Sequence, residues 1–326
     1  MRRLTFIVLI LAAIYGGYWF IGAGAMKKSA ADQFNDLEQS GWQVDYTDLS
    51  TAGFPSRFDT TVNDLTLTTP DGATQWSLPF IQALTLAYKP NEIILAFPPN
   101  QVVTVDRQPI SVTSDSLRAS LNVAPNPALS LGALTAEVGP LTATTGGARL
   151  LSLTSGLAAL RAAEGDHTYD AYLDLDGFAL PDQVKRMLDP STALPQTFGQ
   201  ITIDAILTLD ADIDRHSAKS QPQIDAVDLR GMTITWGDLQ LRGDGSVTID
   251  SDGYPTGDIT LSAQNWRKML PLAMNTGVLT TGAARTIENV AGLLSGGSQT
   301  LDVPFRFANQ QMMLGPIPIG KAPRLR

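Results

Sequence analysis

The sequence predicts a mainly β (α+β) protein, with an N-terminal transmembrane helix followed by an elongated, curved antiparallel β-sheet domain and a few covering helices. Three observations lead to this class. An uncharged apolar stretch runs from Leu4 to Ala25. Beyond residue 41, short segments alternate apolar and polar residues, as half-buried strands do. Turn residues separate these segments without regular strand–helix alternation, which favours antiparallel pairing.

The stretch from Leu4 to Ala25 is long enough to cross a bilayer, because roughly 20 helical residues span a hydrocarbon core of ~30 Å. Arg2 and Arg3 precede it. The positive-inside rule then places residues 1–28 as cytoplasmic tip and anchor in a bacterial inner membrane, with the C-terminal domain, residues 29–326, in the periplasm.

Tyr18 and Trp19 are expected at the outer membrane interface, where amphipathic rings are enriched. A cleaved signal peptide is the alternative, since the small residues from Ala23 to Ala25 fit a cleavage site. The apolar stretch is longer than the usual core of a signal peptide and ends in bulky aromatics. We therefore favour an uncleaved anchor.

The periplasmic domain is predicted to contain many short strands and a few helices. In chain order we expect a short amphipathic helix over Ser29–Ser40, strands within 42–67, Trp76–Tyr88, 93–97, 102–105, 110–112, 117–123, 129–138 and 169–175, a short helix opened by Pro181, a strand over Ile201–Ile213, a meander over 232–263 with turns at 237–238, 244–245 and 252–253, helices over 266–274 and 283–294, and closing strands over 301–307 and 312–319.

Two of these strands carry clear alternation. Trp76–Tyr88 keeps its apolar residues on one parity, and Ile201–Ile213 is apolar at odd positions and mostly Thr or Asp at even ones. One face of each strand is therefore expected to be buried and the other wet. A change of phase between Val62 and Leu65 indicates a bulge near residues 63–64.

A helix is also expected near 148–163, because leucines recur at helical spacing and no proline interrupts them. It separates two strand-rich parts, 42–147 and 165–326. These parts are either two lobes of one sheet or two domains. The absence of a linker rich in Ser, Gly or Pro favours a single unit.

The charge of the chain excludes some partners. Its net charge is −9, and residues 1–28 contribute four positive charges, which leaves −13 for the remainder. A domain this acidic repels phosphate backbones, so no nucleic acid is expected as a partner. There is no cysteine, which excludes disulfides, thiolate zinc sites and cysteine nucleophiles.

No catalytic residue, cofactor site or metal site is predicted, so we expect a protein that is not an enzyme. The run from Gly315 to Ala322 has phosphate-loop spacing, but its two prolines lack the backbone N–H donors that such a loop uses. The aspartates at 210, 212 and 214 imitate a calcium loop without its glycine. His167 and His216 lack a neighbouring nucleophile or ligand motif and are expected at the surface.

Three stretches carry a resemblance to a known family: Gly53-Phe-Pro-Ser-Arg-Phe-Asp59, the run from Leu239 to Trp266, and the closing run from Leu301 to Gly320. In order and spacing they resemble the bacterial family called domain of unknown function 2125, over nearly the whole chain after the anchor. The resemblance implies an anchored periplasmic protein and brings no catalytic residues. The strand–turn–strand pattern is also similar to AsmA-like envelope proteins, whose curved sheets form apolar grooves for lipid.

The candidate binding or structural motif comprises Gly53, Phe54, Pro55 and Arg57. In a functional role, Arg57 would pair with a carboxylate or phosphate of a partner. In a structural role, Pro55 fixes a bend and Arg57 bonds to Asp59, Asp48 or backbone carbonyls. We favour the structural role.

Two functions remain open, and both place the protein on the lipid bilayer through its anchor. In the first, the curved sheet forms a groove for a lipid or other apolar ligand, because an uncovered apolar sheet face generally marks a binding site. In the second, the sheets pack on each other and the domain is a scaffold for envelope proteins, with a filled core.

Overall fold

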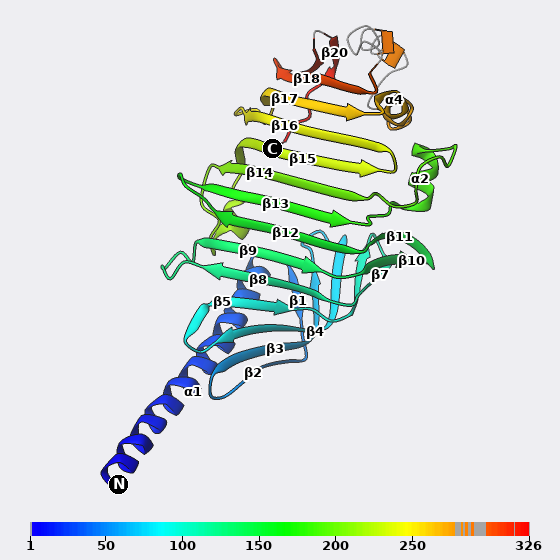
Figure 1. Cartoon of the computed structure of the whole chain (residues 1–326). Helices are drawn as coiled ribbons and strands as arrows, with labels where there is room; N and C mark the ends of the chain where they lie inside the picture. Colours follow the sequence, from blue (N-terminus) through cyan, green and yellow to red (C-terminus); the bar gives the residue numbers. More distant parts are fainter. Residues whose placement is uncertain are drawn as a thin grey trace. The chain divides into compact units, whose positions relative to one another are not determined.

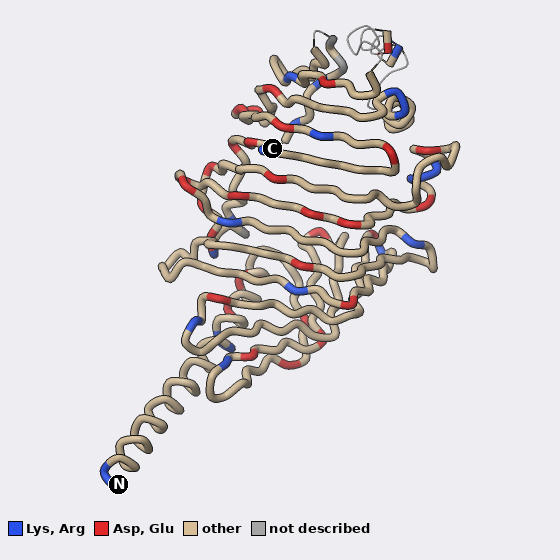
Figure 2. Tube along the Cα trace, in the orientation of Figure 1, with Lys and Arg blue, Asp and Glu red and all other residues tan. Residues whose placement is uncertain are grey.

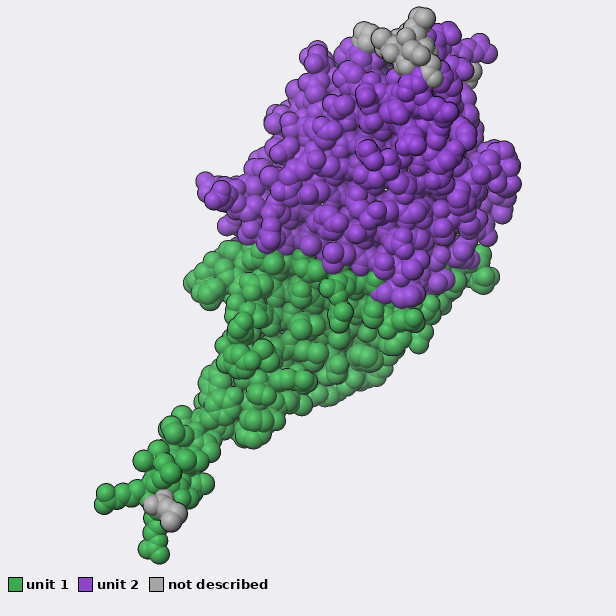
Figure 3. All heavy atoms as spheres, in the orientation of Figure 1, with its two compact units in different colours: residues 1–138, 143–148 green, residues 139–142, 149–326 purple. Residues whose placement is uncertain are grey.

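The alternating segments form antiparallel strands, most of them joined by short turns (Figure 1). The computed structural model describes residues 2–277, 282, 284, 285, 288, 289, 298–315 and 317–325. The chain divides into two compact units (Figure 3), and each is described by itself below. Unit 1 holds residues 1–138 and 143–148, and unit 2 holds residues 139–142 and 149–326.

The N-terminal residues form one continuous helix, α1 (Arg2–Gln39), so the predicted anchor and the predicted helix over Ser29–Ser40 are parts of the same element. It is long and apolar enough to cross a membrane. Figure 2 shows basic residues at its N-terminal tip. The helix ends at Gln39, and Gly41, with a φ of 90°, follows its last turn, where the Trp42 N–H donates to Leu37 O at 3.2 Å.

The sheet of unit 1 is centred on two long strands, β3 and β4. Its strands are β1 (Gln43–Asp45), β2 (Asp48–Ala52), β3 (Arg57–Thr68), β4 (Thr74–Leu86), β5 (Lys89–Ala96), β6 (Asn100–Val105), β7 (Gln108–Ser114), β8 (Leu117–Val123) and β9 (Leu131–Val138). On one side β3 pairs with β1 and β2, and on the other with β4. The first part of β4 pairs with β6 and the last part with β5, so the sheet branches there. One branch continues to β7 and the other to β8 and β9.

Both central strands switch faces at the branch point. In β3, the predicted change of phase occurs at Asp64, which has a φ of 51°. The register with β4 stays constant across it, since Val62 lies opposite Ile81 and Leu65 opposite Leu78. No extra residue is therefore inserted, and the bulge predicted near residues 63–64 is wrong. Pro79 occupies the corresponding place in β4, where it donates no ladder hydrogen bond.

The face switch makes the prediction of one parity along Trp76–Tyr88 wrong. Leu78 is 2% exposed and belongs to an apolar cluster with Val62, while Ile81, of opposite parity, packs against the same cluster. The apolar residues that follow, Leu84 and Leu86, therefore lie on the other face.

Helix α1 covers one face of β1, β2 and β3. Ala30 and Phe34 pack on the cluster formed by Leu49, Val62, Leu65 and Leu78. Closer to the N-terminus, Trp19 and Ala23 are buried with Phe58 and Ala87. The core of unit 1 is therefore built partly from α1.

The helix predicted near 148–163 is wrong. Residues of this segment form strands β11 (Ala148–Leu153) and β12 (Ser155–Ala162), and β10 (Leu141–Thr145) precedes them. In β12, Ala158 and Leu160 lie opposite Leu173 and Ala171 of the next strand. Short apolar runs fit both periodicities, and here pairing with a long neighbouring strand outweighs helical spacing.

The sheet of unit 2 follows chain order from β12 to β20. Its further strands are β13 (Thr168–Asp176), β14 (Gln200–Leu209), β15 (Ile224–Trp236), β16 (Leu239–Ile249), β17 (Pro255–Gln264), β18 (Thr300–Ala308), β19 (Gln311–Leu314) and β20 (Ile317–Lys321). Its helices are α2 (Asp182–Leu188), α3 (Ser217–Ser220) and α4 (Trp266–Asn275). The short helix after Pro181 and the helix at 266–274 are thereby confirmed. The helix predicted over 283–294 lies for the most part outside the described residues.

The unit 2 sheet has one apolar and one polar face. One row of residues opposite each other across six strands is Leu175, Ile201, Ile234, Leu241, Ala263 and Leu301, and the adjacent row is Asp174, Thr202, Thr233, Arg242, Ser262 and Asp302. Ion pairs tie the polar face together, including Arg161 with Asp170 at 2.7 Å and Arg306 with Asp258 at 2.6 Å.

Two boundaries predicted in unit 2 are wrong. The strand predicted over Ile201–Ile213 ends at Leu209, because Asp210 turns the chain by accepting the Gln223 N–H at 2.8 Å. The turn predicted at 244–245 is absent, since β16 runs through it. Gly245 has a φ of 142°, and a Cβ there would lie 2.3 Å from the Asp258 carbonyl oxygen. This glycine therefore permits close strand packing instead of a turn.

Candidate functional site

An apolar hollow of about 490 Å³, open on one side, lies on the unit 1 sheet. Its apolar side chains come from Leu84, Leu86, Ile94 and Ala133, and polar residues at its rim are Arg57, Glu92, Ser120 and Asn122. The hollow is assembled from β3, β4, β5, β8 and β9, so it depends on the long-range pairing of the sheet.

The pairing register decides which side chains line this hollow. Leu86 lies opposite Arg57, and Leu84 lies opposite Asp59 on one side and Ile94 on the other. Residues directly opposite each other share a face, and their neighbours along the strand take the other face. Phe58, which follows Arg57, packs on α1. The hollow is therefore on the sheet face opposite the one that α1 covers.

Arg57 is paired within its own strand. Its Nε lies 3.1 Å from both carboxylate oxygens of Asp59, and its Nη2 also contacts that carboxylate. Asp59 is one of the partners that the structural role assigned to it. This hydrogen bonding raises the pKa of the Arg57 guanidinium above its ordinary value. The rim of the hollow thus carries a balanced ion pair beside an apolar floor.

The other residues of the candidate motif form the turn that leads into β3. Gly53 has a φ of 104°, and its carbonyl oxygen accepts the Arg57 N–H at 2.9 Å. A Cβ at Gly53 would lie 2.8 Å from the Arg57 carbonyl oxygen, so the turn needs glycine. Phe54 precedes a cis peptide bond to Pro55, and its side chain is 58% exposed.

This turn contacts α1. The Tyr15 hydroxyl donates to the Pro55 carbonyl oxygen at 2.9 Å, and the Trp19 indole donates to the Arg57 carbonyl oxygen at 2.8 Å. The Phe54 ring meets the Trp19 ring edge-on, with centroids 5.4 Å apart. Gly53, Phe54, Pro55 and Arg57 are therefore brought together as a docking site for α1.

Tyr18 and Trp19, the two residues predicted at the membrane interface, both make contacts within the protein. Trp19 is 6% exposed because its ring packs between protein side chains. Tyr18 is 48% exposed, and its hydroxyl donates to the Ala87 carbonyl oxygen at 2.5 Å. Sequence reasoning missed Tyr15 as a contact, and it missed the exposed Tyr88 beside Ala87. A tyrosine three residues before another, on one helix face, was the available signal.

Unit 2 contains a smaller apolar hollow of about 290 Å³. Its lining residues come from the apolar sheet face, from α4 and from the end of α2: Leu188, Phe198, Ile234, Trp236, Leu239, Leu241, Met269, Leu272, Ala273 and Thr276. The rings of Phe198 and Trp236 stack with centroids 4.5 Å apart. The two helices thus cover one end of the apolar face.

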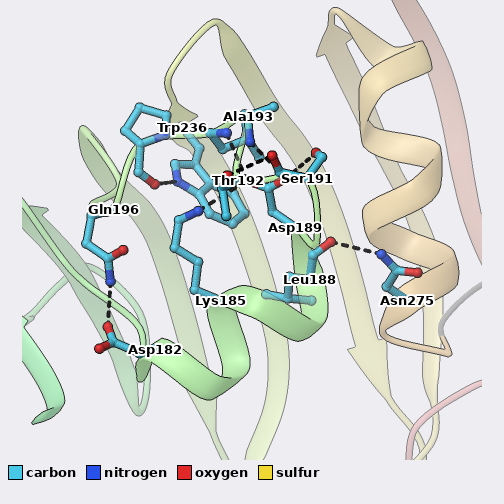
Figure 4. A network of polar contacts seen from close by, with 12 residues as sticks. Asp182, Lys185, Leu188, Asp189, Ser191, Thr192, Ala193, Gln196, Trp236 and Asn275 are labelled. Atoms are coloured by element: carbon cyan, nitrogen blue, oxygen red, sulfur yellow. Dashed lines mark hydrogen bonds and ion pairs between the residues drawn. The ribbon is translucent and has the colours of Figure 1, made fainter.

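A buried ion pair holds α2 against this end of the sheet (Figure 4). Lys185 Nζ lies 3.1 Å from the Asp189 carboxylate, and their side chains are 7% and 4% exposed. The carboxylate also accepts the Ser191 hydroxyl at 2.7 Å and the Leu194 N–H at 2.8 Å. These hydrogen bonds, led by that from the Leu194 N–H, hold the pKa of Asp189 well below its ordinary value.

The Asp189 network is structural, because each charge in it has partners. Lys185 Nζ also lies 5.9 Å from the centroid of the Trp236 ring, and the Trp236 indole donates to the Pro195 carbonyl oxygen at 2.9 Å. Asn275 of α4 donates to the Leu188 carbonyl oxygen at 2.9 Å. The network therefore fixes α2, α4 and the wall of the smaller hollow together. Sequence reasoning missed it, since nothing in the spacing of these residues marks burial.

The remaining polar candidates lie apart. The Asp212 carboxylate accepts a hydrogen bond from His167 Nδ1 at 2.7 Å, which raises the pKa of His167. Asp210 accepts the Gln223 N–H, and Asp214 accepts the His216 N–H at 2.7 Å. Within the described part of the chain, no group of three or more His, Cys, Asp or Glu side chains is placed to hold a metal ion.

Comparison with known proteins finds one matching family. No curated protein matches the chain. The family model described as "Uncharacterized protein conserved in bacteria (DUF2125)" matches residues 19–323, which confirms the resemblance seen in the sequence. The match begins at Trp19, a residue of α1 that is buried in unit 1. The chain belongs to this family of uncharacterized bacterial proteins.

Proposed function

We propose that this protein is a single-pass anchored protein of the bacterial inner membrane, and that its periplasmic part binds the acyl chain of a lipid in the hollow of unit 1. In this function it catalyses no reaction. The observation that carries the proposal is the apolar floor of Leu84, Leu86 and Ile94 in an open hollow of about 490 Å³.

The size and composition of the hollow support an apolar ligand. Ligand sites in proteins typically enclose about 300–1,000 Å³, lined mainly by apolar side chains with a few polar groups that orient the ligand. Ile94 is 48% exposed although it points into the hollow. An acyl chain on this floor would remove Ile94 from water, and the Arg57–Asp59 pair at the rim would face a polar headgroup.

The contacts of α1 support an anchor that stays attached. Cleavage after Ala25 would remove Trp19 and Ala23 from the cluster that buries Phe58, which is 1% exposed. Exposing a buried phenylalanine costs about 2 kcal/mol of transfer free energy alone. Arg2 and Arg3 before the apolar stretch support the cytoplasmic position of the N-terminus.

The test is to count lipids on the full-length protein, extracted from bacterial membranes in mild detergent and weighed by native mass spectrometry. Wild type should carry a stoichiometric phospholipid, and Ile94→Asp should lose it, because a carboxylate on the floor opposes an acyl chain. Ile224→Asp is the matched control, since Ile224 is 40% exposed in unit 2 and should leave the lipid bound. Absence of lipid from wild type, or equal retention by Ile94→Asp, would leave the function as a scaffold for envelope proteins.

A further inference from the structure

The contact between α1 and the sheet of unit 1 begins close to the N-terminus. The part of the helix that precedes this contact is shorter than the thickness of a bilayer. By Tyr15 the helix is already hydrogen-bonded to the Gly53–Arg57 turn. The apolar residues before it, from Leu4 to Ile14, rise only about 16 Å at 1.5 Å per residue. The hydrocarbon core measures ~30 Å. If α1 spans the membrane, about half of the core must therefore be crossed by the part of α1 that carries unit 1.

The surface around this contact is apolar and aromatic. Exposed fractions are 69% for Phe20, 77% for Ile21, 58% for Phe54 and 69% for Tyr88. Phe20 and Phe54 stack with ring centroids 6.2 Å apart. Four large apolar or aromatic side chains exposed beside one helix are unusual on a surface that faces water. They are typical of one that faces the interfacial region of a bilayer.

Backbone carbonyl groups at this end of unit 1 are also hydrogen-bonded by the protein, as an apolar environment requires. Three carbonyl oxygens of the turn and the strand ends, those of Pro55, Arg57 and Ala87, accept hydrogen bonds from Tyr15, Trp19 and Tyr18. In lipid, irregular backbone is tolerated only where its polar groups are satisfied by the protein. The anchor helix supplies these donors itself.

We propose that the tip of unit 1, defined as Phe20, Ile21, Phe54 and Tyr88, is inserted in the periplasmic leaflet of the bilayer that α1 crosses. This inference rests on the anchor of the proposed function. It also deepens that function, because two residues that line the hollow are close in sequence to the tip. Leu86 lies two residues from Tyr88, and Arg57 lies three residues from Phe54. One end of the hollow then meets the leaflet directly, and a lipid enters it without crossing water.

The test uses single cysteines, which the cysteine-free chain makes unambiguous. Full-length Phe54→Cys and Tyr88→Cys are labelled with an environment-sensitive nitrobenzoxadiazole dye and reconstituted in phosphatidylethanolamine–phosphatidylglycerol vesicles, with nitroxide-bearing phosphatidylcholine as quencher. Leu9→Cys reports the span. Asp71→Cys is the aqueous control, because it lies in the β3–β4 turn, about 40 Å along β3 from Arg57.

Dye at positions 54 and 88 should emit at the blue-shifted wavelength of position 9 and lose most of its emission to the nitroxide lipid, while position 71 keeps its emission. Water-like emission at both 54 and 88, with position 9 quenched, would overturn the inserted tip and leave the anchor intact. Water-like emission at position 9 would overturn the anchor, and with it the inserted tip. The native mass spectrometry of wild type and Ile94→Asp tests the binding of lipid in the hollow, and its outcome does not depend on either of these results.

Discussion

The two units cover the apolar faces of their sheets in different ways. In unit 1 a single long helix lies along β1, β2 and β3, and Leu65 and Leu78 of the cluster that it covers are each 2% exposed. In unit 2 the short helices α2 and α4 cover one end, and residues in the middle of the sheet, such as Leu173 and Ile203, are only half-buried. Similar alternating strands thus give a deeply packed core in one unit and a shallow one in the other.

This difference shows that alternation alone does not determine burial. A strand pattern identifies which face is apolar, but the depth of burial depends on what packs on that face. The helix over unit 1 is the N-terminal helix α1, which precedes every strand, whereas the helices over unit 2 are inserted between strands of its own sheet. The contribution of each apolar face to the free energy of unfolding should therefore differ. Three pairs of substitutions test this difference.

Leu78→Ala should have the largest effect, with a loss of about 3 kcal/mol, because it leaves a cavity under α1. Leu173→Ala in unit 2 is its matched control and should cost about 1 kcal/mol, since that side chain is only half-buried. The measurement is urea unfolding of the full-length protein in detergent, with hydrogen exchange to separate the units. Equal losses from the two substitutions would remove the distinction between the cores.

Asp189→Asn should come next, with a loss of about 2 kcal/mol, because the carboxylate accepts several hydrogen bonds and pairs with a buried lysine. Its folded-state pKa is lower than the unfolded value. The stabilisation by Asp189 is therefore fully present above the unfolded-state pKa of about 4 and is lost as the pH falls through the folded-state pKa.

The control for Asp189 is Asp182→Asn on the same helix. Asp182 is exposed and bonds to Arg149 and Gln196, each at 2.9 Å, so its loss should cost less than about 0.5 kcal/mol. Thermal unfolding at several pH values compares the two. If wild type remained more stable than Asp189→Asn by the same amount in strong acid, the charge of Asp189 would not be what stabilises the position of α2.

Gly22→Val should have the smallest effect, about 1 kcal/mol. A Cβ at Gly22 would lie 2.5 Å from Phe58 Cζ, whereas nothing lies within 4 Å of one at Gly16. Over-packing typically costs 1–3 kcal/mol, and the better helix propensity of valine offsets part of it. Gly16→Val should be neutral or slightly stabilising. The measurement is hydrogen exchange of β3 in the two variants. Equal exchange rates in both would contradict the role of α1 as a cover of the sheet.

Much of the fold was predictable because its signals are local. The strand Leu117–Val123 has the predicted bounds, and α1 and α4 follow from composition and spacing. The errors arose where contacts distant in sequence decide the outcome. Residues 148–163 have leucines at helical spacing, yet β13 pairs with Ser155–Ala162 of this segment and makes that part a strand.

The candidate site was predicted only in part for the same reason. Leu84 and Leu86 were expected on an apolar face, and they do line a hollow. That this face is opposite the core follows from the switch at Asp64 and Pro79 in two paired strands, which neither strand reveals alone. The buried pair of Lys185 and Asp189 resembles any exposed i, i+4 pair in sequence, because burial there is decided by Trp236, far along the chain.

Because Trp19 and Ala23 belong to the core of unit 1, the N-terminal helix takes part in the folding of this unit. Strands β3 and β4 can pair without it, because their hydrogen bonds lie within the sheet. The pocket that Phe58 and Ala87 form for Trp19 closes only when α1 packs on the sheet. A chain whose helix has not yet packed there is left with the apolar surface around Phe58 exposed to solvent, which makes the order of the two steps a determinant of its solubility.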